Sequence, residues 1–151
     1  MALTMTGEVD LPAPQHVVWA KLNDAEVLKA SIPGCESLEK ISETEFQAVA
    51  KIKIGPVSAT FKGRVELSDI DAPNGYTISG EGQGGIAGFA KGGAKVRLQP
   101  NGETTMMIYE VEAQVGGKIA QLGARLVDGV AKRMADQFFE RFAERVKAES
   151  A

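Results

Sequence analysis

Residues 80–95 of the chain read GEGQGGIAGFAKGGAK, and the first six letters match the pattern G-x-G-x-x-G of dinucleotide-binding loops. That chemistry requires the glycines to end a strand and to open a helix whose N-terminal N–H groups face a pyrophosphate. After the glycines, however, basic residues alternate with small or apolar ones: Lys91, Lys95 and Arg97 against Gly92, Ala94, Val96 and Leu98. This alternation is typical of a strand. The stretch therefore predicts two strands joined by a glycine-rich connection, and it argues against a phosphate-binding loop.

The same alternation with a period of two extends toward both ends of the chain. It covers residues 3–11, 46–54, 57–67, 76–83 and 107–115. Turn sequences separate these segments: Gly55-Pro56, residues 71–75 and Asn101-Gly102. We expect an antiparallel meander with one apolar and one polar face.

Helical patterns occupy the remaining segments. Pro12 and Pro14 end the first strand, and residues 15–32 suit two short helices, with Asn23-Asp24 capping the second. From Lys118 to about Glu149, apolar residues recur at helical spacing: Ile119, Leu122, Leu126, Val130, Met134, Phe138, Phe142 and Val146. A helix of that length spans roughly 45 Å at ~1.5 Å per residue. We predict one α+β domain, residues 1–151, in which a curved antiparallel sheet wraps around a long C-terminal helix.

Composition limits the class of protein. The chain has 151 residues, of which 44% are hydrophobic and 25% charged, as in an ordinary globular domain. A net charge of -3 argues against a nucleic-acid partner. The single cysteine, Cys35, allows no internal disulfide, and residues 1–151 contain no signal peptide or spanning segment. We expect a cytoplasmic protein.

Similarity to a known family rests on four segments in a fixed order. They are SIPGCESLE (residues 31–39), KIGPVSATFKGRVEL (53–67), GEGQGGIAGFAKGGAKVRL (80–98) and VGGKIAQLGARL (115–126). Together they resemble the CoxG family of carbon monoxide dehydrogenase subunits, within the START-like SRPBCC superfamily. The resemblance covers nearly all of the chain, and it implies a helix-grip fold with an apolar cavity.

The resemblance also implies a role. Members of this family are accessory proteins of molybdenum-containing enzymes of the carbon monoxide dehydrogenase type. They help to bring the enzyme or its quinone electron acceptor together with the cytoplasmic membrane. Members often continue into a tail with a membrane-anchoring segment, and residues 1–151 hold none. Peripheral contact with the inner face of that membrane is therefore the form of membrane association that we expect.

Residues for catalysis are scarce in this sequence. His16 is the only histidine and Cys35 the only cysteine, which excludes the usual zinc and copper sites. The acidic residues of the strands fall on the polar face: Glu8, Asp10, Glu66, Glu81, Glu110 and Glu112. We expect no catalytic residue, no metal and no cofactor, with His16 at the surface or packed on a helix and Cys35 as a small buried side chain.

The apolar face is unusual because many of its residues are small: Gly7, Ala48, Ala50, Ala59, Gly63, Gly80, Gly82, Gly92, Ala94 and Ala113. A core packs to crystal-like density, so large helix residues, close backbone approach or a ligand must compensate. The residues themselves leave two interpretations open. Either the helix packs tightly on the sheet, or a cavity lies near the start of that helix. The resemblance favours the cavity. The predicted lining residues are Phe61, Gly82, Ile86, Phe89, Ala94, Met107, Tyr109, Ala113, Leu122, Gly123, Leu126 and Val130.

Two surface features have alternative interpretations. Ile86 and Phe89 lie in GGIAGFA (residues 84–90), which predicts a hairpin tip with its apolar side chains folded back, a gate over the cavity, or a tip that touches a membrane. A basic row follows the polar face of the strands: Lys51, Lys53, Lys62, Arg64, Lys91, Lys95 and Arg97. A solvated surface is the first interpretation of this row, and a docking patch for a partner is the second.

The leading functional prediction is a non-enzymatic accessory protein. It would bind a hydrophobic small molecule, a quinone or a lipid, and serve a molybdenum hydroxylase of the carbon monoxide dehydrogenase type. The alternatives are a START-like cyclase or hydrolase acting on a hydrophobic substrate, and a pure interaction subunit with a filled core. Inward polar groups would favour the enzyme, and a solid interior would favour the interaction subunit. The sequence leaves the oligomeric state open.

Overall fold

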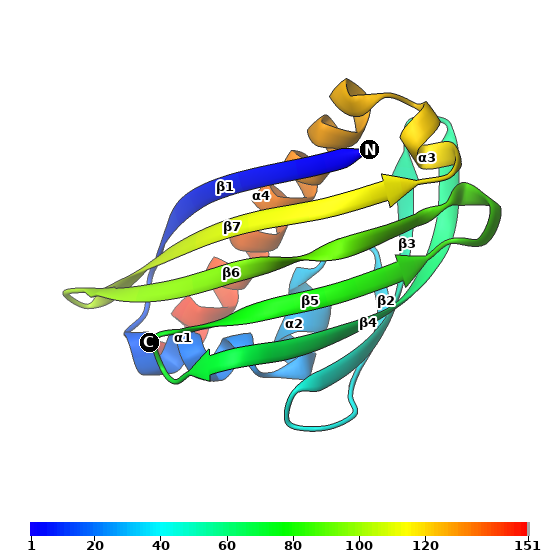
Figure 1. Cartoon of the computed structure of the whole chain (residues 1–151). Helices are drawn as coiled ribbons and strands as arrows, with labels where there is room; N and C mark the ends of the chain where they lie inside the picture. The colour runs from blue at the N-terminus through cyan, green and yellow to red at the C-terminus, as the bar shows by residue number, and fades with distance from the viewer. Residues whose placement is uncertain (151) are drawn as a thin grey trace.

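The computed structural model describes residues 1–150, with side chains described to residue 147. Its strands are β1 (Ala2–Leu11), β2 (Cys35–Lys40), β3 (Glu45–Ile54), β4 (Val57–Asp71), β5 (Gly75–Gln83), β6 (Phe89–Asn101) and β7 (Thr104–Gly116). Its helices are α1 (Gln15–Leu22), α2 (Ala25–Ser31), α3 (Lys118–Gln121) and α4 (Ala124–Ser150), with a 3₁₀ turn, η1 (Gly85–Ala87). The predicted curved sheet around a long C-terminal helix is confirmed (Figure 1).

A single antiparallel sheet of seven strands carries the fold, in the order β1-β7-β6-β5-β4-β3-β2. From β2 to β7 each strand pairs with its neighbour in the chain, as a meander requires. The first strand is the exception, because β1 lies against β7 with Ala2 opposite Gln114. Burial alternates along the strands, so one face points toward α4 and the other toward solvent.

The short helices close one end of the sheet. Asp24 caps α2 as predicted, since its Oδ1 accepts from the backbone N–H of Glu26 at 3.0 Å. Val18 of α1 is fully buried together with Phe142 and Val146 of α4. The helices therefore pack on the second half of α4 and complete a core at this end.

The predicted uninterrupted helix from Lys118 is wrong at residues 122–123. The chain forms a short α3, turns, and begins α4 at Ala124. Gly123 has φ +96°, in the left-handed region that suits glycine, and its carbonyl accepts the N–H of Val127 at 3.2 Å. Gly123 therefore belongs to a joint between two helices, whereas Gly129 lies within α4 as expected. No helix within residues 1–150 has the length and apolar character needed to cross a bilayer.

The buried side chains form two separate clusters. One surrounds Leu11, Val18 and Phe142 at the end closed by the short helices. The other surrounds Ile54 and Val115 at the opposite end, where α3 and the start of α4 meet the strands. The middle of the sheet lies between two packed ends.

Tyr76 supplies a test of the first cluster. Its ring lies 5.4 Å from that of Trp19, and burial raises the pKa of its phenol well above the ordinary value. Unfolded Tyr76 ionises near pH 10, whereas the folded phenol stays neutral. Its contribution to folding is therefore complete below about pH 10 and is lost as the pH rises toward the folded-state pKa.

We expect the unfolding free energy of the wild type to fall more steeply than that of Tyr76→Phe between about pH 9 and pH 11. Urea titrations at several pH values measure both slopes. Because ionisation of Tyr109 and of the lysines affects both proteins, the difference between the slopes isolates Tyr76. Parallel declines would contradict the assignment.

Candidate functional site

Small residues form a continuous band across the inner face of the sheet. Cross-strand pairing aligns Ala48, Gly63, Gly82 and Ala90 in one row, and Val65, Gly80, Gly92 and Ala113 in the next. All of these except Ala90, which was assigned to the connection at residues 84–90, are residues that the sequence alternation predicted to face inward. The register therefore collects them in one area that faces α4.

The glycines of this band have different surroundings. A Cβ atom on Gly92 would lie 2.6 Å from the Cα of Ala113, and one on Gly63 would lie 2.8 Å from the carbonyl oxygen of Glu81. Neither site has room for a side chain. On Gly82, by contrast, the nearest atom would be the carbonyl oxygen of Lys62 at 4.0 Å. The inner surface is therefore open at Gly82.

Larger side chains in or beside the band are also incompletely covered. Val65, Ile78 and Val111 face α4 from the middle of the sheet, and yet each is only half-buried. Toward the two ends of the same face, Val96 is 2% and Val115 is 5% exposed. Solvent thus reaches the central part of a face that a close-packed core would seal.

A cleft between β1 and α4 opens beside this region. Its volume is about 360 Å³, and its lining includes Leu3 and Met5 from β1 and Tyr109 from β7. The helix contributes Asp128, Lys132 and Asp136, which repeat every four residues and so share one side of α4. The cleft therefore has an apolar floor and a charged rim.

Tyr109 lines this cleft from β7. Its ring stacks on Phe139 of α4 at 5.1 Å between centroids and covers Gly7, where a side chain would overlap it. Burial raises the pKa of the Tyr109 hydroxyl, and the nearby Asp136 carboxylate raises it further. The hydroxyl therefore stays protonated at neutral pH and can donate a hydrogen bond at the cleft.

A row of aromatic rings runs from Tyr109 at the cleft into the first cluster. Phe139 meets Phe138 edge-on at 5.2 Å, and Phe138 stacks on the fully buried Phe142 at 5.5 Å. With Tyr109, these rings fill the space between α4 and the sheet on that side. The open region lies on the other side, toward Gly82.

The structure distributes the predicted lining residues over several places. Those on the inner face or on α4 at the second cluster are Phe61, Gly82, Ala94, Tyr109, Ala113, Leu126 and Val130. Leu122 packs on the same cluster from the joint before α4, and Gly123 in that joint is exposed. Met107 is buried in the first cluster, on the filled side of Tyr109.

Ile86 and Phe89 lie outside this region. Ile86 is 85% exposed in η1, where Ala87 turns inward in its place. Phe89 is 40% exposed and pairs with Gly116 on the outer face, in phase with Lys91. Its ring covers Gly116. The strand register explains this placement, because an apolar residue in the phase of the basic row must point outward.

The rim residues were missed from the sequence. Asp128, Lys132 and Asp136 are charged and lie on α4, so a hydrophobic pattern does not select them. Their spacing of four was visible in the sequence. This spacing indicates the rim of a cleft only when β1 is known to pair with β7 and to run beside that side of the helix.

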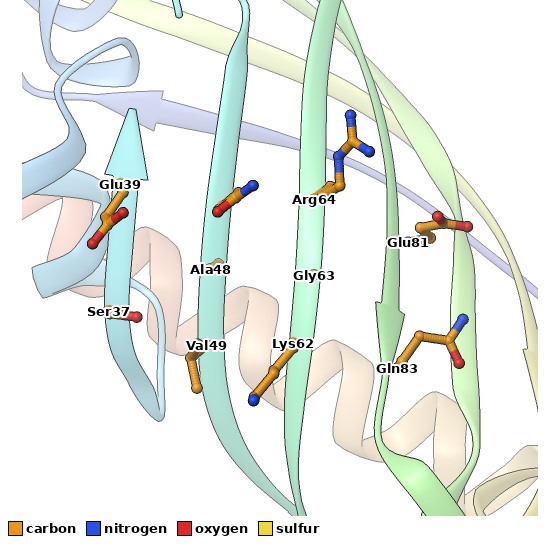
Figure 2. Close-up of a pocket in the computed structure, with 10 residues that line it drawn as sticks. Ser37, Glu39, Ala48, Val49, Lys62, Gly63, Arg64, Glu81 and Gln83 are labelled. Atoms are coloured by element: carbon orange, nitrogen blue, oxygen red, sulfur yellow. The ribbon is translucent and has the colours of Figure 1, made fainter. Parts of the chain in front are cut away.

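The outer face of the sheet holds two open depressions. Figure 2 shows Lys62, Arg64, Glu81 and Gln83 projecting on the side away from α4, around a depression of about 380 Å³. Arg64 Nη2 lies 2.7 Å from Glu45 Oε1. The larger depression, about 780 Å³, surrounds Gly93, where outward residues of opposite charge are cross-strand neighbours. The basic row is thus interleaved with acids, as a solvated sheet surface is.

His16 and Cys35 lie away from the cleft. His16 is exposed on α1. The Cys35 thiol donates to the carbonyl oxygen of Ser37 at 3.3 Å, and burial raises its pKa, which keeps it protonated. Among the described residues, no three histidine, cysteine or acidic side chains are grouped as a metal site would need.

Comparison with known proteins places this geometry in context. The family model for CoxG, described as the G subunit of carbon monoxide dehydrogenase, matches residues 7–147. A conserved protein from Geobacillus kaustophilus is 34% identical, with a TM-score of 0.91, and the match covers 99% of this chain and 98% of that one. No protein of curated function matches the sequence.

Two more distant structures share the fold. A START superfamily protein from Mycobacterium smegmatis has a TM-score of 0.73 at 14% identity, covering 96% of this chain and 97% of that one. The Zhui aromatase/cyclase from Streptomyces sp. R1128 has a TM-score of 0.71 at 12% identity, covering 97% and 94%. The predicted START-like helix-grip fold is confirmed.

The difference between Gly82 and Gly92 can be tested by adding one methyl group to each. Gly82→Ala should raise the unfolding free energy by about 0.4–1 kcal/mol, because it restricts the unfolded chain and meets nothing in the folded one. Gly92→Ala should lower it by more than about 1 kcal/mol, because the backbone of Ala113 must move. Urea unfolding measures both. Equal losses would show that the inner face is closed at Gly82.

Proposed function

The chain belongs to the CoxG family of carbon monoxide dehydrogenase subunits, and we propose that it is a non-enzymatic accessory protein that binds a hydrophobic small molecule between its sheet and α4. The ligand is a quinone or a lipid. The partner is a molybdenum hydroxylase of the carbon monoxide dehydrogenase type, which the protein helps to couple to the membrane. Family membership supports the partner, and the geometry of the interior supports the ligand.

The open inner surface at Gly82 is the observation that carries ligand binding. Its cross-strand neighbours Gly63 and Ala90, and Phe61 two residues before Gly63 on the same face of β4, present carbon atoms rather than polar groups. Burial of apolar surface contributes about 25 cal/mol per Å². An apolar molecule in this space would cover side chains that the fold itself leaves half-exposed.

The cleft indicates what kind of molecule fits. Leu3 and Met5 provide an apolar floor, while the neutral Tyr109 hydroxyl and the Asp136 carboxylate provide a donor and an acceptor at the rim. A ligand with an apolar body and a polar head can satisfy both parts at once. Quinones and lipids share this construction.

Polar groups inside the core support the accessory role over an enzyme. The buried Thr105 Oγ1 donates to the carbonyl oxygen of Ala13 at 2.8 Å, and Ser31 Oγ donates to that of Val27 at 2.7 Å. Both hydroxyls hold backbone in place. Tyr109 beside Asp136 is the pair that would serve the second candidate, a cyclase acting on a hydrophobic substrate. The two candidate functions predict different experimental results, because an accessory protein releases its ligand chemically unchanged and with the same mass.

Native mass spectrometry of protein purified without detergent, followed by organic extraction, tests the proposal directly. We expect a bound apolar species of defined mass. A short-chain ubiquinone added to delipidated protein should bind, and the recovered quinone should keep its mass. Delipidated protein that binds neither quinone nor fatty acid would support an interaction subunit with a filled core.

Gly82→Leu gives a sharper result. The added side chain points into the proposed cavity and should weaken ubiquinone binding by about tenfold or more, equivalent to ~1.4 kcal/mol. The melting temperature of the delipidated protein should not fall, because the side chain enters open space. Gly129→Leu is the matched control, since Gly129 is exposed on α4 and its Cβ would meet no atom within 4 Å. Equal affinity in both variants would contradict the location of the cavity.

A further inference from the structure

Three segments meet at the end of the molecule opposite α1 and α2, which we call the tip end. They are residues 53–57 at the β3–β4 turn, residues 83–91 around η1, and residues 116–126 at α3 and the start of α4. Figure 1 shows them together on the right-hand side. Ile54, Ala87 and Ile119, one from each segment, belong to the same buried cluster. The tip end is therefore one packed unit.

Exposed apolar side chains protrude from the tip end. Ile86 is 85% exposed, more than Ile41, Ile70 or Phe89, the other exposed large hydrophobic residues of the described chain. It lies at the apex of η1 between Gly85, with φ +62°, and Gly88, with φ +121°. Phe89 begins β6 directly after this turn and is 40% exposed. The fold therefore presents one large aliphatic side chain to solvent, with an aromatic ring beside it.

The charges of the tip end are all of one sign. The three segments contain Lys53, Lys91, Lys118 and Arg125, all exposed, and no Asp or Glu. The chain as a whole has 20 acidic and 17 basic residues. A local excess of cations in an acidic protein gives this end a charge opposite to that of the rest of the surface.

Protruding apolar side chains framed by cations match an anionic bilayer surface. The apolar group can enter the boundary between headgroups and acyl chains, while the cations contact lipid phosphates. A specific protein interface ordinarily buries about 800 Å² on each partner around a packed core. One isoleucine at a narrow loop apex suits insertion between headgroups better than such a core.

We propose that the tip end docks on an anionic lipid surface, with Ile86 inserted and Lys118 and Arg125 in contact with lipid headgroups. This inference rests on the proposed function and names the surface through which the protein meets the membrane. Gly82 immediately precedes the tip-end segment 83–91. Docking therefore brings the open part of the interior next to the bilayer, from which an apolar ligand can be exchanged.

Flotation with lipid vesicles tests the docking surface in the full chain. The wild type should float with vesicles of phosphatidylcholine and phosphatidylglycerol, and not with phosphatidylcholine alone. High salt should reduce the bound fraction, because it screens the cations. Ile86→Ser should reduce that fraction by about fivefold or more. The double variant Lys118→Glu/Arg125→Glu should abolish flotation.

Matched controls carry the same chemical changes at other places. Ile41→Ser removes an isoleucine that is 48% exposed in the β2–β3 connection. Arg141→Glu/Arg145→Glu makes the same change in net charge at two exposed residues in the second half of α4. Both should float like the wild type. Because all these side chains are exposed, melting temperatures should stay close to that of the wild type.

Two kinds of result would overturn the inference. One is equal flotation of the tip-end and control variants, or no flotation of the wild type. The other is loss of binding to the molybdenum enzyme, with vesicle binding intact, in Lys118→Glu/Arg125→Glu, which would assign the surface to a protein partner. Ubiquinone binding to Ile86→Ser in solution separates the two proposals. If it persists while flotation of the wild type fails, the docking surface is wrong and ligand binding stands.

Discussion

Close backbone contact in the centre of the sheet is the constraint on which the rest of the structure depends. At Gly92 the backbone of β6 lies so near to Ala113 of β7 that no side chain fits, and Gly63 meets the neighbouring β5 in the same way. Glycine at these positions lets the sheet coil tightly around α4. The same glycines leave little side-chain volume on the inner face. Curvature and an under-filled interior therefore have one origin in the sequence.

Division of the interior follows from this constraint. Large side chains concentrate at the two ends, where α1, α2 and the second half of α4 form one cluster and α3 with the start of α4 forms the other. Phe139, which packs against the first cluster, stacks on Tyr109 at the cleft. Large buried side chains are thus concentrated at the ends, and the middle of the inner face is less completely covered. An arrangement of this kind separates residues that hold the fold from residues that can contact a ligand.

Sequence reasoning succeeded where one local rule determines the structure. Alternation predicted every strand except β2, because one face of the sheet is covered. Asp24 marked the start of α2 because its side chain caps that helix. The predicted uninterrupted helix was wrong at Gly123. The helical spacing of apolar residues continues across the joint, and only the backbone φ angle of Gly123 reveals the break. Phe89 was predicted to line the cavity because it is apolar, although it alternates together with the outward-facing basic residues of β6. The strand alternation decided its position, and its side chain lies on the outer face. The rim of the cleft depends on the pairing of β1 with β7, which no local pattern contains.

The pairing of β1 with β7 also has a consequence for how the chain folds. The strands from β2 to β7 form local hairpins, whereas β1 must wait for a partner that lies about a hundred residues later in the chain. Loop-closure entropy makes such a long-range contact slow to form. During synthesis, strands β2 to β6 can assemble before β1 has a partner. The cleft needs both β1 and α4, so it is completed in the last steps of folding. A nascent chain can then exist as a partly formed sheet with no cleft.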